Sequence, residues 1–134
     1  MKSAAIDPLV IERVPREGMK LACALMRDPA PLHWDDEEVQ RQGLGDRAFN
    51  PGIINAAYVV QAVGRWAGGY GRVKEVSIRF ESRLFADDRA IASGDIDAVS
   101  EQPDGSVRVS VKLESEVAGE REVVISGEIV VASA

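Results

Sequence analysis

The chain has 134 residues, of which 46% are hydrophobic and 28% are charged, a composition that fits one folded domain and excludes a disordered chain. Its net charge of −6, with no basic cluster, argues against nucleic-acid binding, and no apolar run approaches the roughly 20 residues that span a bilayer. The one cysteine, Cys23, has no partner for an intrachain disulfide. We therefore expect Cys23 to be a small buried hydrophobe in a cytoplasmic protein.

The first half of the chain, through about residue 68, has the pattern of helices and loops. Residues 8–14 predict a short opening strand, and residues 18–27 are rich in helix formers. Two prolines follow that segment and cannot continue the helix. Asp35 stands where an N-cap belongs, with Glu38 three residues further on, which predicts a short helix to about Gln42.

The strongest helix signal covers residues 53–67. Asn50 suits the N-cap, Pro51 suits the first helical position, and two glycines from Gly68 suit the end. The segment holds one cation, Arg65, and no carboxylate. A helix this apolar is expected to bury most of its circumference.

Four segments of the second half alternate apolar and polar residues, the pattern of strands with one buried face. They cover residues 75–81, 90–97, 107–114 and 123–131. The predicted buried face starts with Val76, Ile78 and Phe80 and ends with Val123, Ile125, Ile129 and Val131. Turn residues at 102–105 and 118–120 predict antiparallel hairpins between the second and third and between the third and fourth strands.

A long apolar helix beside an antiparallel sheet with one apolar face predicts an α+β domain in which the sheet wraps around the helix. This arrangement is the hot-dog fold, and residues 1–134 are expected to form one such domain. An isolated sheet of this kind has exposed edges, so we expect it to pair with a second copy or with another chain.

The only histidine, His33, follows Asp28 by five residues, and two prolines stiffen the segment between them. A carboxylate and an imidazole around one water form a general acid/base pair. Taken alone, His33 is more often an inert, satisfied polar group. Its spacing from Asp28 makes it a hypothesis for catalysis.

The helix opening at Asn50-Pro51-Gly52 is a second site for chemistry. A buried helix N-terminus offers free N–H groups, and Gly52 would let a substrate oxygen approach without a side chain in the way. Such a site would suit the oxyanion of a thioester carbonyl. The alternative is an ordinary helix cap that needs no ligand.

Asp28 and His33, with Pro31 between them, resemble the hydratase motif of the MaoC-like family, which includes the (R)-specific enoyl-CoA hydratases. The resemblance runs from about Lys20 to Val131. It implies a hot-dog fold in which Asp28 and His33 orient and activate water and Gly52 supplies an oxyanion N–H. It also implies no cofactor beyond the coenzyme A of the substrate.

The chain departs from that family pattern in three places. Ala30 stands where the family usually has Asn, Pro51 where it often has His, and residues 86–88 where it often has Pro-Gly-Asp. These differences indicate a divergent branch. The opening of the long helix resembles short members linked to bulky acyl-CoA substrates, including steroid side chains, some of which are heteromers with a second hot-dog chain.

Several further side chains are hypotheses for substrate binding, each beside a structural alternative. Arg79 and Arg83 are the first cations to test against coenzyme A phosphates, and the alternative is a solvated strand face. The remaining hypotheses are Trp34, Asn50, Asn55 and Tyr58, which packing or internal hydrogen bonding would also explain. One histidine and one cysteine are too few for a structural zinc site, so no metal is expected.

The sequence thus predicts an enoyl-CoA hydratase, a hydro-lyase that acts as a homodimer or higher oligomer. One alternative is a hot-dog thioesterase, which needs a carboxylate on or near the central helix, where residues 53–67 have none. Another is a non-catalytic partner of a heteromeric hydratase, which would have no need of both Asp28 and His33.

Overall fold

The computed structural model describes residues 6–133, with side chains described at 6–96 and 102–133. The elements in chain order are β1 (Leu9–Ile11), α1 (Arg16–Met26), η1 (Pro31–His33), α2 (Asp36–Arg41), α3 (Gly52–Ala67), η2 (Tyr70–Arg72), β2 (Val73–Phe80), β3 (Arg89–Glu101), β4 (Val107–Val117) and β5 (Glu120–Val131). The elements η1 and η2 are single 3₁₀ turns. No described helix is long and apolar enough to cross a membrane.

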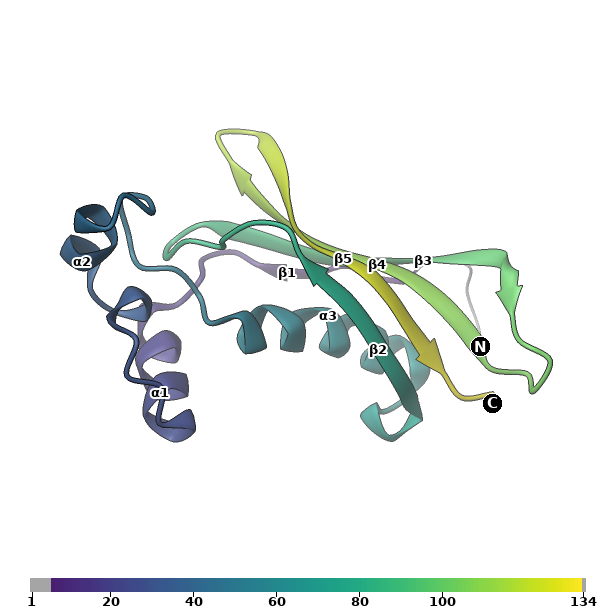
Figure 1. The fold of residues 1–134 in the computed structure, drawn as a ribbon. Coiled ribbons are helices and arrows are strands. Elements are labelled where there is room, and N and C mark those ends of the chain that lie inside the picture. Colours follow the sequence, from purple (N-terminus) through teal and green to yellow (C-terminus); the bar gives the residue numbers. More distant parts are fainter. Residues whose placement is uncertain (1–5, 134) are drawn as a thin grey trace.

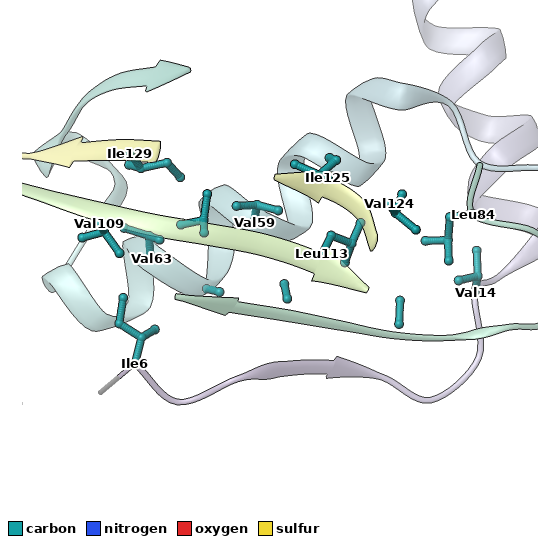
Figure 2. Close-up of a cluster of buried hydrophobic side chains, with 14 of the residues drawn as sticks. Ile6, Val14, Val59, Val63, Leu84, Val109, Leu113, Val124, Ile125 and Ile129 are labelled. Atoms are coloured by element: carbon teal, nitrogen blue, oxygen red, sulfur yellow. The ribbon is translucent and has the colours of Figure 1, made fainter. Parts of the chain in front are cut away.

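The five strands form one antiparallel sheet in the order β1-β3-β4-β5-β2, and α3 runs along one face of it (Figure 1). Aliphatic side chains fill the space between the helix and the sheet (Figure 2). Val59 and Val63 of α3 face Leu113, Ile125 and Ile129 of the strands, and all five are at most 1% exposed. The predicted hot-dog arrangement is confirmed.

Both predicted hairpins are present, and their turns follow from local chemistry. Between β3 and β4, the Gly105 N–H donates to the Gln102 carbonyl at 2.9 Å. Between β4 and β5, the turn takes Ala118 at φ 52° and Gly119 at φ 80°. Two successive residues in the left-handed region match the twist of a tight hairpin.

The central helix begins at Gly52, one residue after Pro51, which was predicted as the first helical position. Its N-cap is Pro51, no side chain caps it, and Gly52 is the first helical residue, so the prediction of Asn50 as the N-cap is wrong. The Asn50 side chain donates instead to Oδ1 of Asn55 at 3.0 Å, and its backbone N–H donates to the Leu84 carbonyl. Asn50 is thereby used inside the fold, where an unpaired amide would be costly.

Two of the predicted strand faces differ from the structure. The pairing register of β5 with β4 shifts between Leu113 and Glu114, so Val124 turns inward at 0% exposed while Val123 is 39% exposed. This is the effect of a β-bulge, which inserts one residue and reverses the alternation. In β2, an edge strand, Val76 and Phe80 are 41% and 54% exposed, although the alternation predicted a buried face there.

The segment that carries α1 and α2 lies beyond one end of the helix-and-sheet layers (Figure 1). Ion pairs join its two helices to each other and attach it to the rest of the fold. The Arg16 guanidinium binds Asp36 at 2.9 Å and Asp87 at 3.1 Å, and Arg47 binds Asp88 at 2.9 Å. One Asp36 oxygen also accepts the Ala48 N–H at 2.8 Å. These contacts fix the position of the intervening loop that contains Asp28 and His33.

Candidate active site

The structure brings Asp28 and His33 together at the turn that follows α1. The helix ends at Arg27 in the left-handed conformation, and the Asp28 N–H donates to the Cys23 carbonyl at 2.9 Å. One Asp28 oxygen accepts the Ala30 N–H at 3.0 Å, which holds the carboxylate against its own loop. The other oxygen lies 3.9 Å from Nε2 of His33.

The orientation of the His33 ring is set from its other nitrogen. Nδ1 lies 2.7 Å from the Phe49 carbonyl oxygen. A carbonyl can only accept, so Nδ1 carries the proton, and in the neutral ring Nε2 presents a lone pair toward Asp28. The Phe49 ring meets the imidazole edge-on at 5.4 Å between centroids. The side chain of His33 is 13% exposed, so it is held firmly but remains accessible on one side.

Cys23 of α1 is the third polar group at this position. Its residue is 3% exposed, as the sequence predicted for a small buried hydrophobe. Burial raises the pKa of its thiol, and the nearby Asp28 carboxylate raises it further. Asp28 faces Nε2 of His33, and the Phe49 carbonyl occupies Nδ1. A thiol whose pKa is raised is not activated as a nucleophile.

An open cleft of about 610 Å³ lies beside this group. Its lining consists of Lys20, Cys23, Ala24, Arg27, Asp28, Pro29 and Trp34. The predicted pocket residue Trp34 is part of this wall and is 38% exposed. The cations Lys20 and Arg27 were missed by the sequence analysis, although their spacing of seven residues, with Cys23 between them, places all three on one stripe of a helix.

Gly52 lies apart from the cleft lining among the described residues, three positions after the Phe49 that holds His33. The Pro51 carbonyl accepts the N–H groups of Ile54 and Asn55, at 3.0 and 3.4 Å. A Cβ at position 52 would lie 3.2 Å from the Phe80 ring, so a glycine permits this close contact. The structure therefore brings Asp28 and His33 together. Gly52 is linked to this pair by the short backbone segment from Phe49, whose carbonyl binds His33.

The other residues predicted to bind substrate differ in their burial and in their contacts. Asn55 is 3% exposed, and its Oδ1 accepts the side-chain N–H of Asn50, so one group of each amide is used inside the fold. Tyr58 is half-buried and packs against the core. The guanidinium of Arg83 sits 5.4 Å from the centre of the Phe49 ring, one ring away from His33. Arg79 is exposed on the edge strand β2.

Neither a protein-family model nor a curated protein matches the sequence of this chain. Solved structures do match its fold. An (R)-hydratase from A. caviae involved in PHA biosynthesis superposes with a TM-score of 0.81 at 18% identity, over 100% of this chain and 99% of that one. This chain has the hot-dog fold. The R-hydratase PhaJ1 from Pseudomonas aeruginosa gives 0.76 at 17% identity, over 100% of this chain and 84% of its own.

A third hot-dog match is the ChsH1-ChsH2 complex from Mycobacterium tuberculosis, with a TM-score of 0.75 at 21% identity over 98% of this chain and 99% of that one. Structures described as MaoC-like dehydratases are also among the neighbours. The resemblance found in the sequence is thus matched by the fold. At these identities the structural likeness concerns the fold, and the chemistry has to be argued from the residues.

Proposed function

We propose that this chain is a MaoC-like hydratase/dehydratase that adds water reversibly to the 2,3 double bond of a 2-enoyl thioester of coenzyme A. The observation that carries the proposal is the pairing of Asp28 with Nε2 of His33 at 3.9 Å beside an open cleft. Two acceptors at that distance are too far apart for a direct hydrogen bond and suit one water molecule that donates to both.

The proposed reaction uses that water as the nucleophile. His33 Nε2 accepts a proton from it while its oxygen bonds to C3 of the enoyl group. The Asp28 carboxylate then relays that proton from His33 to C2, so one water is added across the double bond and both groups end as they began. The Nδ1 bond to Phe49 supports this role, because it fixes the ring with its basic nitrogen toward the carboxylate.

Negative charge develops on the thioester oxygen during this addition. The first N–H groups of α3 are the proposed donors, with Gly52 giving the closest approach, since no side chain caps this helix end. The positive end of a 16-residue helix adds to the attraction. The negative charge on coenzyme A would be met by Lys20 and Arg27 at the cleft, and by Arg83 beside Phe49.

We also propose that the working form is an oligomer, either of this chain alone or with a second hot-dog chain. Strand β2 is an edge strand with its apolar Val76 and Phe80 exposed, and Ile53 of α3 is also exposed, at 58%. An apolar edge strand favours pairing with another chain. The ChsH1-ChsH2 match is itself a complex of two chains, which supports the heteromeric alternative.

A spectroscopic assay tests the proposed function. The native chain is supplied with crotonyl-CoA and with a long or polycyclic enoyl-CoA, and the loss of conjugated enoyl absorbance is followed. Loss of general acid/base catalysis by Asp28→Asn or His33→Ala is expected to lower the rate by about 10²- to 10⁴-fold. Asp46→Asn, at an Asp whose side chain is 77% exposed, is the matched control and is expected to keep the native rate.

Three outcomes would redirect the proposal. Unchanged rates in both Asp28→Asn and His33→Ala would refute the mechanism. An inactive native chain on every enoyl substrate would favour the partner-chain alternative, which co-purification then tests. Release of free coenzyme A without hydration would favour a thioesterase, although α3 carries no carboxylate for that chemistry.

A further inference from the structure

Three side chains of different chemistry meet at the end of α1. Cys23, Asp28 and His33 each offer one ligand atom, and these three atoms lie within 4.8 Å of one another. Cys23 is buried and Asp28 and His33 are half-buried, and Cys23 and Asp28 line the cleft. By residue count alone, one histidine and one cysteine are too few for a zinc site. The fold adds a carboxylate to them.

The set of donors matches a borderline-soft divalent ion. Zn²⁺ takes thiolate sulfur, imidazole nitrogen and carboxylate oxygen, and three protein ligands with one open position are common for it. Zinc-ligand bonds of about 2.0–2.3 Å in a tetrahedron place the ligand atoms about 3.3–3.8 Å apart. The Asp28 and His33 atoms, at 3.9 Å, are already close to that spacing, and the Cys23 sulfur lies within 4.8 Å of both.

The surroundings of the ligands already resemble those of a metal site. A histidine that binds a metal normally donates its other ring N–H to a carbonyl or carboxylate, as Nδ1 of His33 does to Phe49. A ligating carboxylate is normally held by a hydrogen bond, as one oxygen of Asp28 is by the Ala30 N–H. The free oxygen of Asp28 and Nε2 of His33 face each other, and the cleft supplies an entry path and room for a water ligand.

We propose that Cys23, Asp28 and His33 bind one Zn²⁺ ion per chain and that this ion blocks the acid/base pair. On binding, the S–H bond of Cys23 breaks, a Zn–S bond forms and the proton goes to solvent. The thiolate and the carboxylate then balance the two charges of the ion. Lys20 and Arg27 line the same cleft and oppose a cation, but both are exposed, so water screens them.

The binding claim stands independently of the proposed function, and only the inhibition rests on it. The first test is therefore made without substrate. Metal-free protein is titrated calorimetrically with Zn²⁺, and with Co²⁺ while the sulfur-to-cobalt charge-transfer absorption is followed. We expect one ion per chain, a thiolate band with Co²⁺, and at least a tenfold loss of Zn²⁺ affinity in Cys23→Ala and in Asp28→Asn.

Glu37→Gln is the matched control, because Glu37 is an exposed carboxylate on α2 outside the cluster, and it is expected to keep the native affinity. Thermal unfolding checks that each variant is folded, and Asp28→Asn decides the matter if Cys23→Ala does not fold. Equal Zn²⁺ affinity in native protein and folded Cys23→Ala, or the absence of a thiolate band, would overturn the proposal.

The hydration assay separates the two proposals. Zn²⁺ near the measured dissociation constant is expected to halve the native rate, and added chelator is expected to restore it. A chain that binds Zn²⁺ as described but hydrates no enoyl-CoA overturns the proposed function and leaves the metal site supported. A chain that hydrates enoyl-CoA but binds no Zn²⁺ supports the proposed function and overturns the metal site.

Discussion

The helix-and-sheet part of this molecule and its α1–α2 part are held together by different forces. In the first, α3 and the strands bury a continuous cluster of aliphatic side chains. In the second, α1 and α2 bury only Met19, Cys23 and Val39 within their described spans, and of these Met19 alone belongs to that cluster. An ion pair between Arg16 and Asp36 joins the two helices, and ion pairs to Asp87 and Asp88 attach the segment to the rest of the fold. Leu21 and Leu25 of α1 are 62% and 76% exposed.

This difference matters because the proposed acid/base pair belongs to the weakly buried part. Apolar burial gives the fold its stability, whereas charged hydrogen bonds give the Asp28–His33 loop its position. Among the described residues, only the Phe49 carbonyl connects His33 to the rest of the fold by a direct hydrogen bond. Substitutions are therefore expected to act on stability in one part and on the site in the other.

The same substitution made in both parts gives the largest contrast. Leu113→Ala in β4 removes a side chain that is 0% exposed, and the lost burial and the cavity are expected to cost about 2–5 kcal/mol of the free energy of unfolding. Leu25→Ala in α1, at 76% exposed, is expected to change it by less than about 0.5 kcal/mol. Urea denaturation measures both, and equal losses would contradict the division into two parts.

A second contrast removes one carboxylate that anchors the α1–α2 part. Asp36→Ala leaves the buried Ala48 N–H and Nη1 of Arg16 without their acceptor, although Nε of Arg16 keeps Asp87, and the loss is expected to cost about 1–3 kcal/mol. Asp46→Ala, which removes an exposed partner of Arg47, is expected to cost about 0–1 kcal/mol. Urea denaturation gives both values, and the hydration rate is expected to fall only in Asp36→Ala. A native rate in that variant would show that the site does not depend on this anchor.

Lowering the pH tests the same ion pairs without substituting any side chain. Hydrogen bonds from Arg16 and from the Ala48 N–H lower the pKa of Asp36, and hydrogen bonds from Arg13 and Arg16 lower that of Asp87. Below the ordinary Asp value of 3.8 the unfolded chain therefore binds more protons than the folded one. The stabilisation is complete above that value and is lost as the pH falls through the lowered folded pKa values.

The measurement is the free energy of unfolding at neutral pH and at steps below the ordinary Asp pKa. The native chain is expected to lose stability over that window, and Arg16→Gln is expected to lose less, because its carboxylates start closer to their ordinary pKa. Leu113→Ala is expected to be shifted by a constant amount at every pH, since it touches no titrating group. An equal acid slope in the native chain and in Arg16→Gln would rule out this linkage.

The sequence predicted the apolar part well because periodicity is a local signal. The alternation gave all four long strands, and the turn residues gave both hairpins. It failed at Val123 and Val124, where a bulge reverses the faces, and at Val76 and Phe80, where the strand lies at the sheet edge. The alternation of apolar and polar residues indicates neither a bulge nor the position of a strand within the sheet.

The sequence predicted only those features of the site that involve residues close together along the chain. The five-residue step from Asp28 to His33 pointed to a pair, and the structure brings the two together. The acceptor of His33, the Phe49 carbonyl, lies 16 residues away, and only folding sets that contact. The approach of Cys23 to both follows from the way the chain turns at Arg27, a non-glycine residue at φ 54° that propensity does not favour.

The smallest expected change in stability separates the two roles of Gly52. An alanine there would gain up to about 1 kcal/mol of helix propensity, while its Cβ, 3.2 Å from the Phe80 ring, would push that ring by a few tenths of an ångström. The ring is 54% exposed and can move, so the net change is expected to stay within about 1 kcal/mol. The methyl group would still crowd the proposed oxyanion site, and the hydration rate is expected to fall by about tenfold or more, up to the 10²–10³ of a lost donor.

The double variant Gly52→Ala/Phe80→Ala distinguishes crowding of the ring from crowding of the substrate. Without the Phe80 ring, the added methyl group has no close neighbour from that side, so any loss of stability due to the clash disappears. The rate is expected to stay low, because the methyl group still stands beside the helix N–H groups. Recovery of the rate relative to Phe80→Ala alone would mean that Gly52 serves only the packing of Phe80, and the oxyanion role would then pass from α3 to another donor.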